Sequence, residues 1–181
     1  LALEVASENL SFDPLNFRAA YELYLIQTAS RQGRDAKATL AELETKIRGQ
    51  VQSVLEVAID YANSGLWEEA ISCLEDLTDV KKKRATTNPM AFYYLGYFWE
   101  QNGKSGTGSA YYREGAKASP DYCFPFRLEA IAVLNQVLTK NSADGHAAYY
   151  LGNLLYDNQP SIAIKAWEMA ARLLGRFPTV H

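Results

Sequence analysis

The sequence predicts an all-α fold, an α-α superhelix built as a row of antiparallel helical hairpins. Apolar residues recur three and four positions apart along almost the whole chain, and the period-two alternation that marks strands is absent. Clusters of Gly, Pro, Asn, Asp and Ser interrupt this pattern repeatedly. The pair Leu95-Gly96 recurs as Leu151-Gly152, each time after a run of aromatic residues, which indicates an internal repeat.

About ten helices are expected between the interruptions. The segments contain about 10 to 17 residues, which is a common length for helices of globular proteins. Because the connections are short, each helix is expected to run antiparallel to the one before it. The interruptions lie, in chain order, at Asp13-Pro14, 31–35, Gly49, 63–65, 87–89, 102–106, Ser119-Pro120, 141–145 and 158–160.

We predict one array over residues 1–181, divided into hairpin units. In the first helix of a unit, a small residue such as Gly96 or Gly152 lies among large apolar residues. A small residue lets two helix axes approach to about 8–10 Å. One hairpin cannot bury its apolar face alone, so the hairpins are expected to stack. The expected units are 14–48, 51–84, 89–122, a partial unit at 123–142, and 145–178.

The partial unit is indicated by a short spacing. Small residues near the start of the second helices are Ala70, Gly108, Ala130 and Ala163. Gly108 and Ala130 are closer than one repeat by about the length of one helix. We therefore expect a helix over residues 127–140 whose partner is reduced to 122–126, and a local change in the direction of the superhelix.

These patterns resemble the tetratricopeptide repeat, a helix-turn-helix unit of about 34 residues. The resemblance implies a right-handed superhelix whose first helices line a concave groove for a peptide or partner domain. Segments 122–129, 149–157 and 166–168 further resemble the repeat arrays of large bacterial proteins with an N-terminal β-rich domain of unknown function. The unit at 89–122 carries the clearest signature, in the order Phe92, Leu95, Gly96, Trp99, Gly108, Tyr112 and Pro120.

The resemblance also implies which residues face the groove. Tyrosines are prominent among them, and a phenol combines a large contact area with a polar tip. The alternative is that a neighbouring helix packs on this face, because apolar stripes at helical spacing commonly serve packing. Family members that hold a C-terminal carboxylate place lysines where this chain has Tyr149 and Asp157. The predicted partner-binding residues are Tyr93, Tyr97, Glu100, His146, Tyr149, Asn153 and Tyr156.

The sequence carries no catalytic motif, and we expect a non-enzymatic protein without a metal or cofactor. Two histidines and two cysteines form no metal-binding pattern, and Cys73 is expected to be a small buried residue. The segment Gly103 to Gly106 lacks the spacing of a phosphate loop and is expected to be an inter-helix turn. The basic run from Lys81 to Arg84 is expected to be a solvated loop.

Charge and hydropathy disfavour two classes of partner. The net charge is −3, which provides no global attraction for nucleic acid or for an anionic membrane. No apolar run approaches the ~18 residues of a membrane-spanning helix. Because residues 1–4 resemble the middle of a helix, we expect a fragment of a longer protein. Its compartment is open, with the cytoplasm favoured.

The expected function is that of a protein-protein interaction scaffold. Its partner would be a peptide, another protein or another domain of the same chain. Two alternatives stay open. The array could be an accessory region of a carbohydrate-processing enzyme, or it could associate with itself through its ends. The sequence leaves the oligomeric state undecided.

Overall fold

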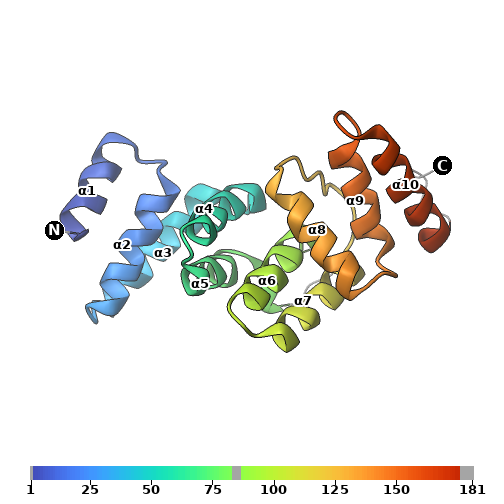
Figure 1. Cartoon of the computed structure of the whole chain (residues 1–181). Coiled ribbons are helices and arrows are strands. Elements are labelled where there is room, and N and C mark those ends of the chain that lie inside the picture. Colours follow the sequence, from blue (N-terminus) through green and yellow to red (C-terminus); the bar gives the residue numbers. More distant parts are fainter. Residues whose placement is uncertain (1, 83–86, 176–181) are drawn as a thin grey trace. The chain divides into compact units, whose positions relative to one another are not determined.

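The computed structural model describes residues 2–82 and 87–175, and the regular structure in these ranges is entirely helical. It contains ten α-helices and one short 3-10 turn (Figure 1). The predicted all-α hairpin architecture is confirmed. The chain forms two compact units, divided between Thr78 and Asp79. Lys83, Arg84 and His181 lie outside the described residues. The C-terminal ends of the two hairpin repeats expected at 51–84 and 145–178 lie outside them as well.

The first unit consists of two antiparallel hairpins and one further helix. Its helices are α1 (Ala2–Phe12), α2 (Phe17–Ala29), α3 (Gly33–Ile47), α4 (Val51–Asn63) and α5 (Trp67–Leu77). Helices α2 and α3 form one hairpin, α4 and α5 form the other, and α1 packs against α2 (Figure 1).

The core of the first unit is built around tyrosines, two of which bond to the same carboxylate. Tyr21 is fully buried, and its ring meets the edge of Tyr61 with a centroid distance of 6.1 Å. The hydroxyls of Tyr21 and Tyr24 both donate to Asp76 Oδ2, at 3.0 and 3.2 Å. Cys73 is also fully buried, as expected for a small apolar residue. This core joins α2 to the α4–α5 hairpin.

The second unit contains two hairpins separated by a single helix. Its helices are α6 (Pro89–Gln101), α7 (Ser105–Lys117), α8 (Glu129–Lys140), α9 (Gly145–Leu155) and α10 (Pro160–Leu174), after the 3-10 turn Asp79–Lys82. Helix α6 pairs with α7 and α9 pairs with α10, whereas α8 packs on both α6 and α9. Because residues 119–128 form no helix, the predicted incomplete hairpin near 121–140 is confirmed.

Glycines bring the helices of the second unit into close contact. A Cβ atom at Gly96 would lie 2.5 Å from the ring of Tyr112 and 2.9 Å from the carbonyl oxygen of Gly108. A Cβ atom at Gly152 would lie 2.4 Å from the indole of Trp167. Distances this short exclude a side chain. The repeated Leu-Gly pair therefore marks the point where the first helix of a hairpin meets the large aromatic residue of the second.

Candidate functional site

Tyr93, the first of the predicted groove residues, lies in the interior of the second unit. It is 0% exposed, and its hydroxyl donates to Asp144 Oδ2 at 2.9 Å. Its ring occupies the space beside Gly115, where a Cβ atom would lie 2.4 Å away. Burial, followed by the nearby Asp144 carboxylate, raises the pKa of Tyr93 well above its usual value. The expectation that Tyr93 faces a partner is corrected here, because the fold itself uses both its ring and its hydroxyl.

Glu100 is held by α8 rather than presented to solvent. Its Oε2 accepts hydrogen bonds from Tyr112 Oη at 3.0 Å and Gln136 Nε2 at 2.7 Å. Its Oε1 is 3.1 Å from Lys140 Nζ, and its side chain is 5% exposed. Burial raises the pKa of Glu100, but the hydrogen bonds from Gln136, Lys140 and Tyr112 outweigh it, so the pKa is lowered. At Glu100, therefore, the face of α6 is covered by the neighbouring helix α8, which is the packing alternative to a partner-binding groove.

The other predicted residues lie nearer the surface, on α6 and α9. Tyr97, His146 and Tyr149 are half-buried, whereas Asn153 and Tyr156 are exposed. Trp167 Nε1 donates to Asn153 Oδ1 at 3.0 Å, and the Trp167 ring lies 5.1 Å from that of Tyr156. The structure thus brings Asn153 and Tyr156 together around Trp167.

A groove with a volume of about 480 Å³ lies elsewhere, between α1 and α2 of the first unit. This volume is within the range of about 300–1,000 Å³ that is typical of ligand sites. None of the seven predicted residues lines it. The apolar lining residues are Ala2, Val5, Ala6, Ala19 and Ile26, and the polar ones are Asn9, Asn16, Arg18 and Glu22.

The lining follows from helix geometry. Residues three or four positions apart share a face of a helix. On α1 this places Ala2, Val5 and Ala6 beside one another, and on α2 it aligns Arg18, Glu22 and Ile26. Of the lining alanines, Ala6 and Ala19 are buried, at 3% and 6% exposed, whereas Val5 is 49% exposed. We call the five apolar lining residues the floor of the groove; Arg18, Glu22 and the two asparagines complete the lining.

The charged groups of the groove contact residues of α4. The Arg18 guanidinium lies 5.2 Å from the centroid of the Tyr61 ring and 3.6 Å from Asp60 Oδ2. Its side chain is 42% exposed, so part of its donor set faces solvent. Burial, and then the neighbouring Glu22 carboxylate, raises the pKa of Tyr61. Glu22 and Arg18 thus flank the same phenol.

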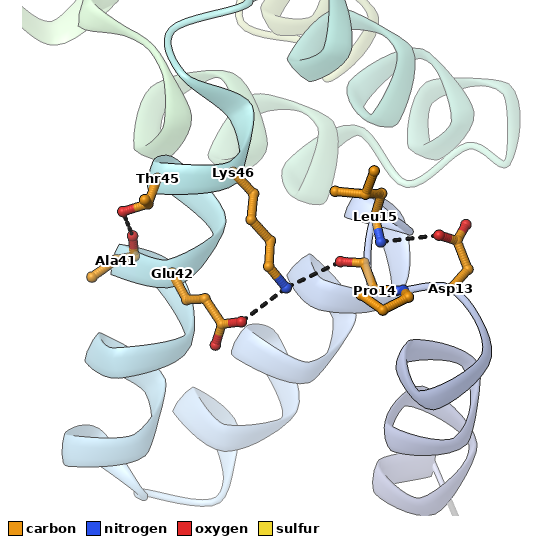
Figure 2. Close-up of polar contacts among 7 residues, drawn as sticks. All are labelled: Asp13, Pro14, Leu15, Ala41, Glu42, Thr45 and Lys46. Carbon is orange, nitrogen blue, oxygen red and sulfur yellow. Dashed lines mark hydrogen bonds and ion pairs between the residues drawn. The ribbon is translucent and has the colours of Figure 1, made fainter.

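The connection between α1 and α2 is held in place by α3 (Figure 2). Lys46 Nζ donates to the carbonyl oxygen of Pro14 at 3.0 Å and pairs with Glu42 Oε1 at 2.8 Å. Asp13 Oδ1 accepts from the backbone N–H of Leu15 at 3.0 Å, which closes a local turn. These contacts set the position of α1, one wall of the groove, relative to the α2–α3 hairpin.

Sequence reasoning missed this groove for an identifiable reason. The predicted partner-binding residues all lie between Tyr93 and Tyr156, because the clearest repeat signature is in the unit at 89–122. The signal was nevertheless present: Arg18, Glu22 and Ile26 follow one another at intervals of four, opposite a helix with alanines at positions 2 and 6.

Chemical reactivity at the cysteines is disfavoured by their surroundings. Burial raises the pKa of the Cys123 thiol to about 11, despite hydrogen bonds from Tyr150 and the Met90 backbone, and burial also raises the pKa of Cys73. Both are free thiols. Within the described residues, no three His, Cys, Asp or Glu side chains gather as a metal site would require. None of the described helices has the length and hydropathy to cross a membrane.

Comparison with known proteins gives distant likenesses. No protein-family model and no curated protein matches the sequence. The structure is similar to the crystal structure of MamA, with 13% identity, a TM-score of 0.37, and coverage of 96% of this chain and 87% of that one. It is also similar to YrrB, described as a TPR protein with an unusual peptide-binding site, with 12% identity, a TM-score of 0.35, and coverage of 98% and 96%. At these identities and TM-scores, the likenesses do not define a family for the chain.

Proposed function

We propose that this chain is a non-catalytic scaffold of the tetratricopeptide type and that it binds a peptide in the groove between α1 and α2. The observation that carries the proposal is the groove itself, with about 480 Å³ of space over an apolar floor. The hairpins and their glycine crossings support the repeat assignment. The narrower resemblance to bacterial proteins with a β-rich domain stays a prediction.

The lining indicates the chemistry of the peptide. One apolar side chain would lie on the floor beside Val5 and Ala6, where burial of its surface provides most of the binding free energy. The exposed part of the Arg18 guanidinium would pair with a carboxylate on the peptide. Asn16 uses its side-chain oxygen to cap α2, so its amide nitrogen is the atom left to donate to a peptide carbonyl.

Selection from a displayed library of random peptides tests this proposal. Peptides selected on the chain should share an apolar anchor next to an acidic residue. Val5→Glu should weaken their binding by at least about tenfold, because it places a carboxylate on the apolar floor. Val5 is 49% exposed, so the substitution should leave the fold intact.

Ser7→Glu is the matched control. It adds the same charge to an exposed position of α1 that does not line the groove, and peptide binding should change by less than about twofold. If no peptide is enriched, or if Val5→Glu binds the enriched peptides as well as Ser7→Glu does, the proposal is wrong.

A further inference from the structure

The link between α7 and α8 exposes apolar side chains in a regular pattern. Tyr122, Phe124, Phe126 and Leu128 are 89%, 75%, 61% and 69% exposed. The residues between them are buried or half-buried: Cys123, Pro125 and Arg127. Tyr122 has a left-handed backbone (φ 57°) and Leu128 a helical one (φ −64°, ψ −29°), so the alternation marks residues 123–127 as the extended part, with one side turned to the fold and the other to solvent. The exposed rings of Phe124 and Phe126, with Tyr122 and Leu128 exposed beside them, mark an interaction surface.

This extended segment is anchored at both ends. Cys123 Sγ lies 3.6 Å from Asn88 Oδ1, at the residue that caps α6. The backbone N–H of Cys123 donates to the carbonyl oxygen of Pro120 at 3.2 Å, and the carbonyl of Arg127 accepts from the N–H of Ala130 at 3.1 Å. A segment that is already held in place loses little conformational entropy when a partner binds it.

One backbone edge of the segment is open. In an extended chain, the N–H and C=O groups of alternate residues point to the same edge. On the edge of residues 123, 125 and 127, the first N–H and the last C=O are already bonded, and Pro125 has no N–H. Across the described part of the chain, no hydrogen bond reaches the backbone groups of Phe124 or Phe126. These groups therefore form an unpaired edge of the kind that accepts an additional strand.

The charges beside the segment indicate which kind of partner could bind to it: a second copy of the chain, a membrane or another protein. Asp121 and Glu129 flank it, and both are exposed. Antiparallel pairing of two copies about Pro125 would place Asp121 of one copy opposite Glu129 of the other, and such like-charge pairs are destabilising. The same carboxylates would be repelled by an anionic membrane surface. The complementary occupant is a strand with basic ends.

We propose that residues 123–127 form a docking edge for an extended segment of a protein partner, which has apolar side chains at alternate positions and Lys or Arg at its ends. The partner strand would bond to the backbone of Phe124 and Phe126 and cover their rings. This edge lies in the second unit and does not depend on the α1–α2 groove.

A display library of peptides of about nine residues, with apolar residues fixed at alternate positions and the others randomised, tests this proposal. Enriched peptides should carry basic ends and should slow hydrogen exchange of the Phe124 and Phe126 amides. Phe126→Pro, which removes the N–H but keeps an apolar side chain, should weaken binding by at least about tenfold. Phe126→Ile, which keeps the N–H, should weaken it by less than about threefold. Circular dichroism should show unchanged helicity in both variants.

Several outcomes would overturn the docking edge. One is that no such peptide is enriched, and another is that the Pro and Ile variants bind equally well. A third is that the segment mediates sedimenting dimers of the chain or binding to phosphatidylcholine or phosphatidylserine vesicles instead. Val5→Glu should leave binding at this edge unchanged, which separates a failure here from a failure of the α1–α2 groove.

Discussion

Helix α2 of the first unit and helix α6 of the second unit are each the first helix of a hairpin, but one borders a groove and the other is covered by a neighbouring helix. On α2, Arg18, Glu22 and Ile26 border an open groove beside α1. On α6, Tyr93 is buried and Glu100 is bonded to two residues of α8. The difference teaches that a helical stripe becomes a binding face only if the neighbouring helix leaves room for a ligand. Beside α2 a groove of about 480 Å³ stays open, whereas Gln136 and Lys140 of α8 bond to Glu100 on α6.

The largest effect should come from the glycine crossing that supports the second unit. Gly96→Ala would place a Cβ atom 2.5 Å from Tyr112 and 2.9 Å from a backbone oxygen that cannot easily move. We expect a loss of about 3 kcal/mol in the free energy of unfolding, measured by urea titration. Gly106→Ala, which meets nothing within 4 Å, should be neutral or stabilising by up to about 1 kcal/mol. Equal effects of the two variants would contradict the crossing, and peptide binding in the first unit should survive both.

The contact between α8 and α6 should depend on pH through Glu100. Its pKa is lowered from 4.5 in the folded chain, so its stabilising contribution is fully present above that pH and is lost as the pH falls toward the folded value. Glu100→Gln should cost about 1–2 kcal/mol at pH 7 and less at an acidic pH below 4.5, measured by urea unfolding at each pH. A cost that is the same at both pH values would contradict this role.

Two comparisons isolate the Glu100 effect. Burial, partly opposed by hydrogen bonds from the Ala147 N–H and the Tyr93 hydroxyl, raises the pKa of Asp144, so its contribution changes with pH in the opposite sense. Asp144 is present in both proteins, so its contribution cancels when the unfolding free energy of Glu100→Gln is subtracted from that of the wild type at the same pH. Glu114→Gln, which affects the surface ion pair with Lys117, should cost less than about 0.5 kcal/mol at either pH.

Arg18 should distinguish a binding face from a packed one. Arg18→Gln should weaken peptides with an acidic residue by about fivefold, because the exposed guanidinium is lost, and should leave their neutral amide analogues nearly unchanged. Titration calorimetry with each peptide pair measures this difference. A similar loss for acidic and neutral peptides would show that Arg18 only supports Tyr61, a role that the unfolding free energy of the variant would also reveal.

The smallest effect should come from the anchor of the α1–α2 connection. Lys46→Met should cost about 0.5–1 kcal/mol in the stability of the first unit and should weaken peptide binding in proportion, because Pro14 loses its hydrogen bond. Glu42→Gln removes only the charge of the ion pair and should cost less than about 0.5 kcal/mol. If the two substitutions have the same effect on peptide binding, the Pro14 contact does not hold the groove.

Much of the fold could be predicted because its signals are local. Periodic apolar residues and breaks at Pro89, Gly103 and Gly145 mark helices, and the recurring Leu-Gly pair marks the hairpins. The missing helix before α8 was also predictable, since a spacing short by one helix is a property of the sequence. The exposure of the tyrosines was harder to predict. Tyr93 and Tyr97 are four positions apart on α6, yet Tyr93 is buried and Tyr97 is half-buried.

The sequence by itself determined that this chain forms helical hairpins, with glycines where helices cross and one hairpin left incomplete. Only the tertiary structure decided which faces are closed. It placed Gln136 and Lys140 on Glu100, left space between α1 and α2, and turned Tyr122, Phe124 and Phe126 outward. The physical reason is that helix formation depends on neighbours a few residues apart. The exposure of a side chain depends instead on residues that are distant in sequence and meet only after folding.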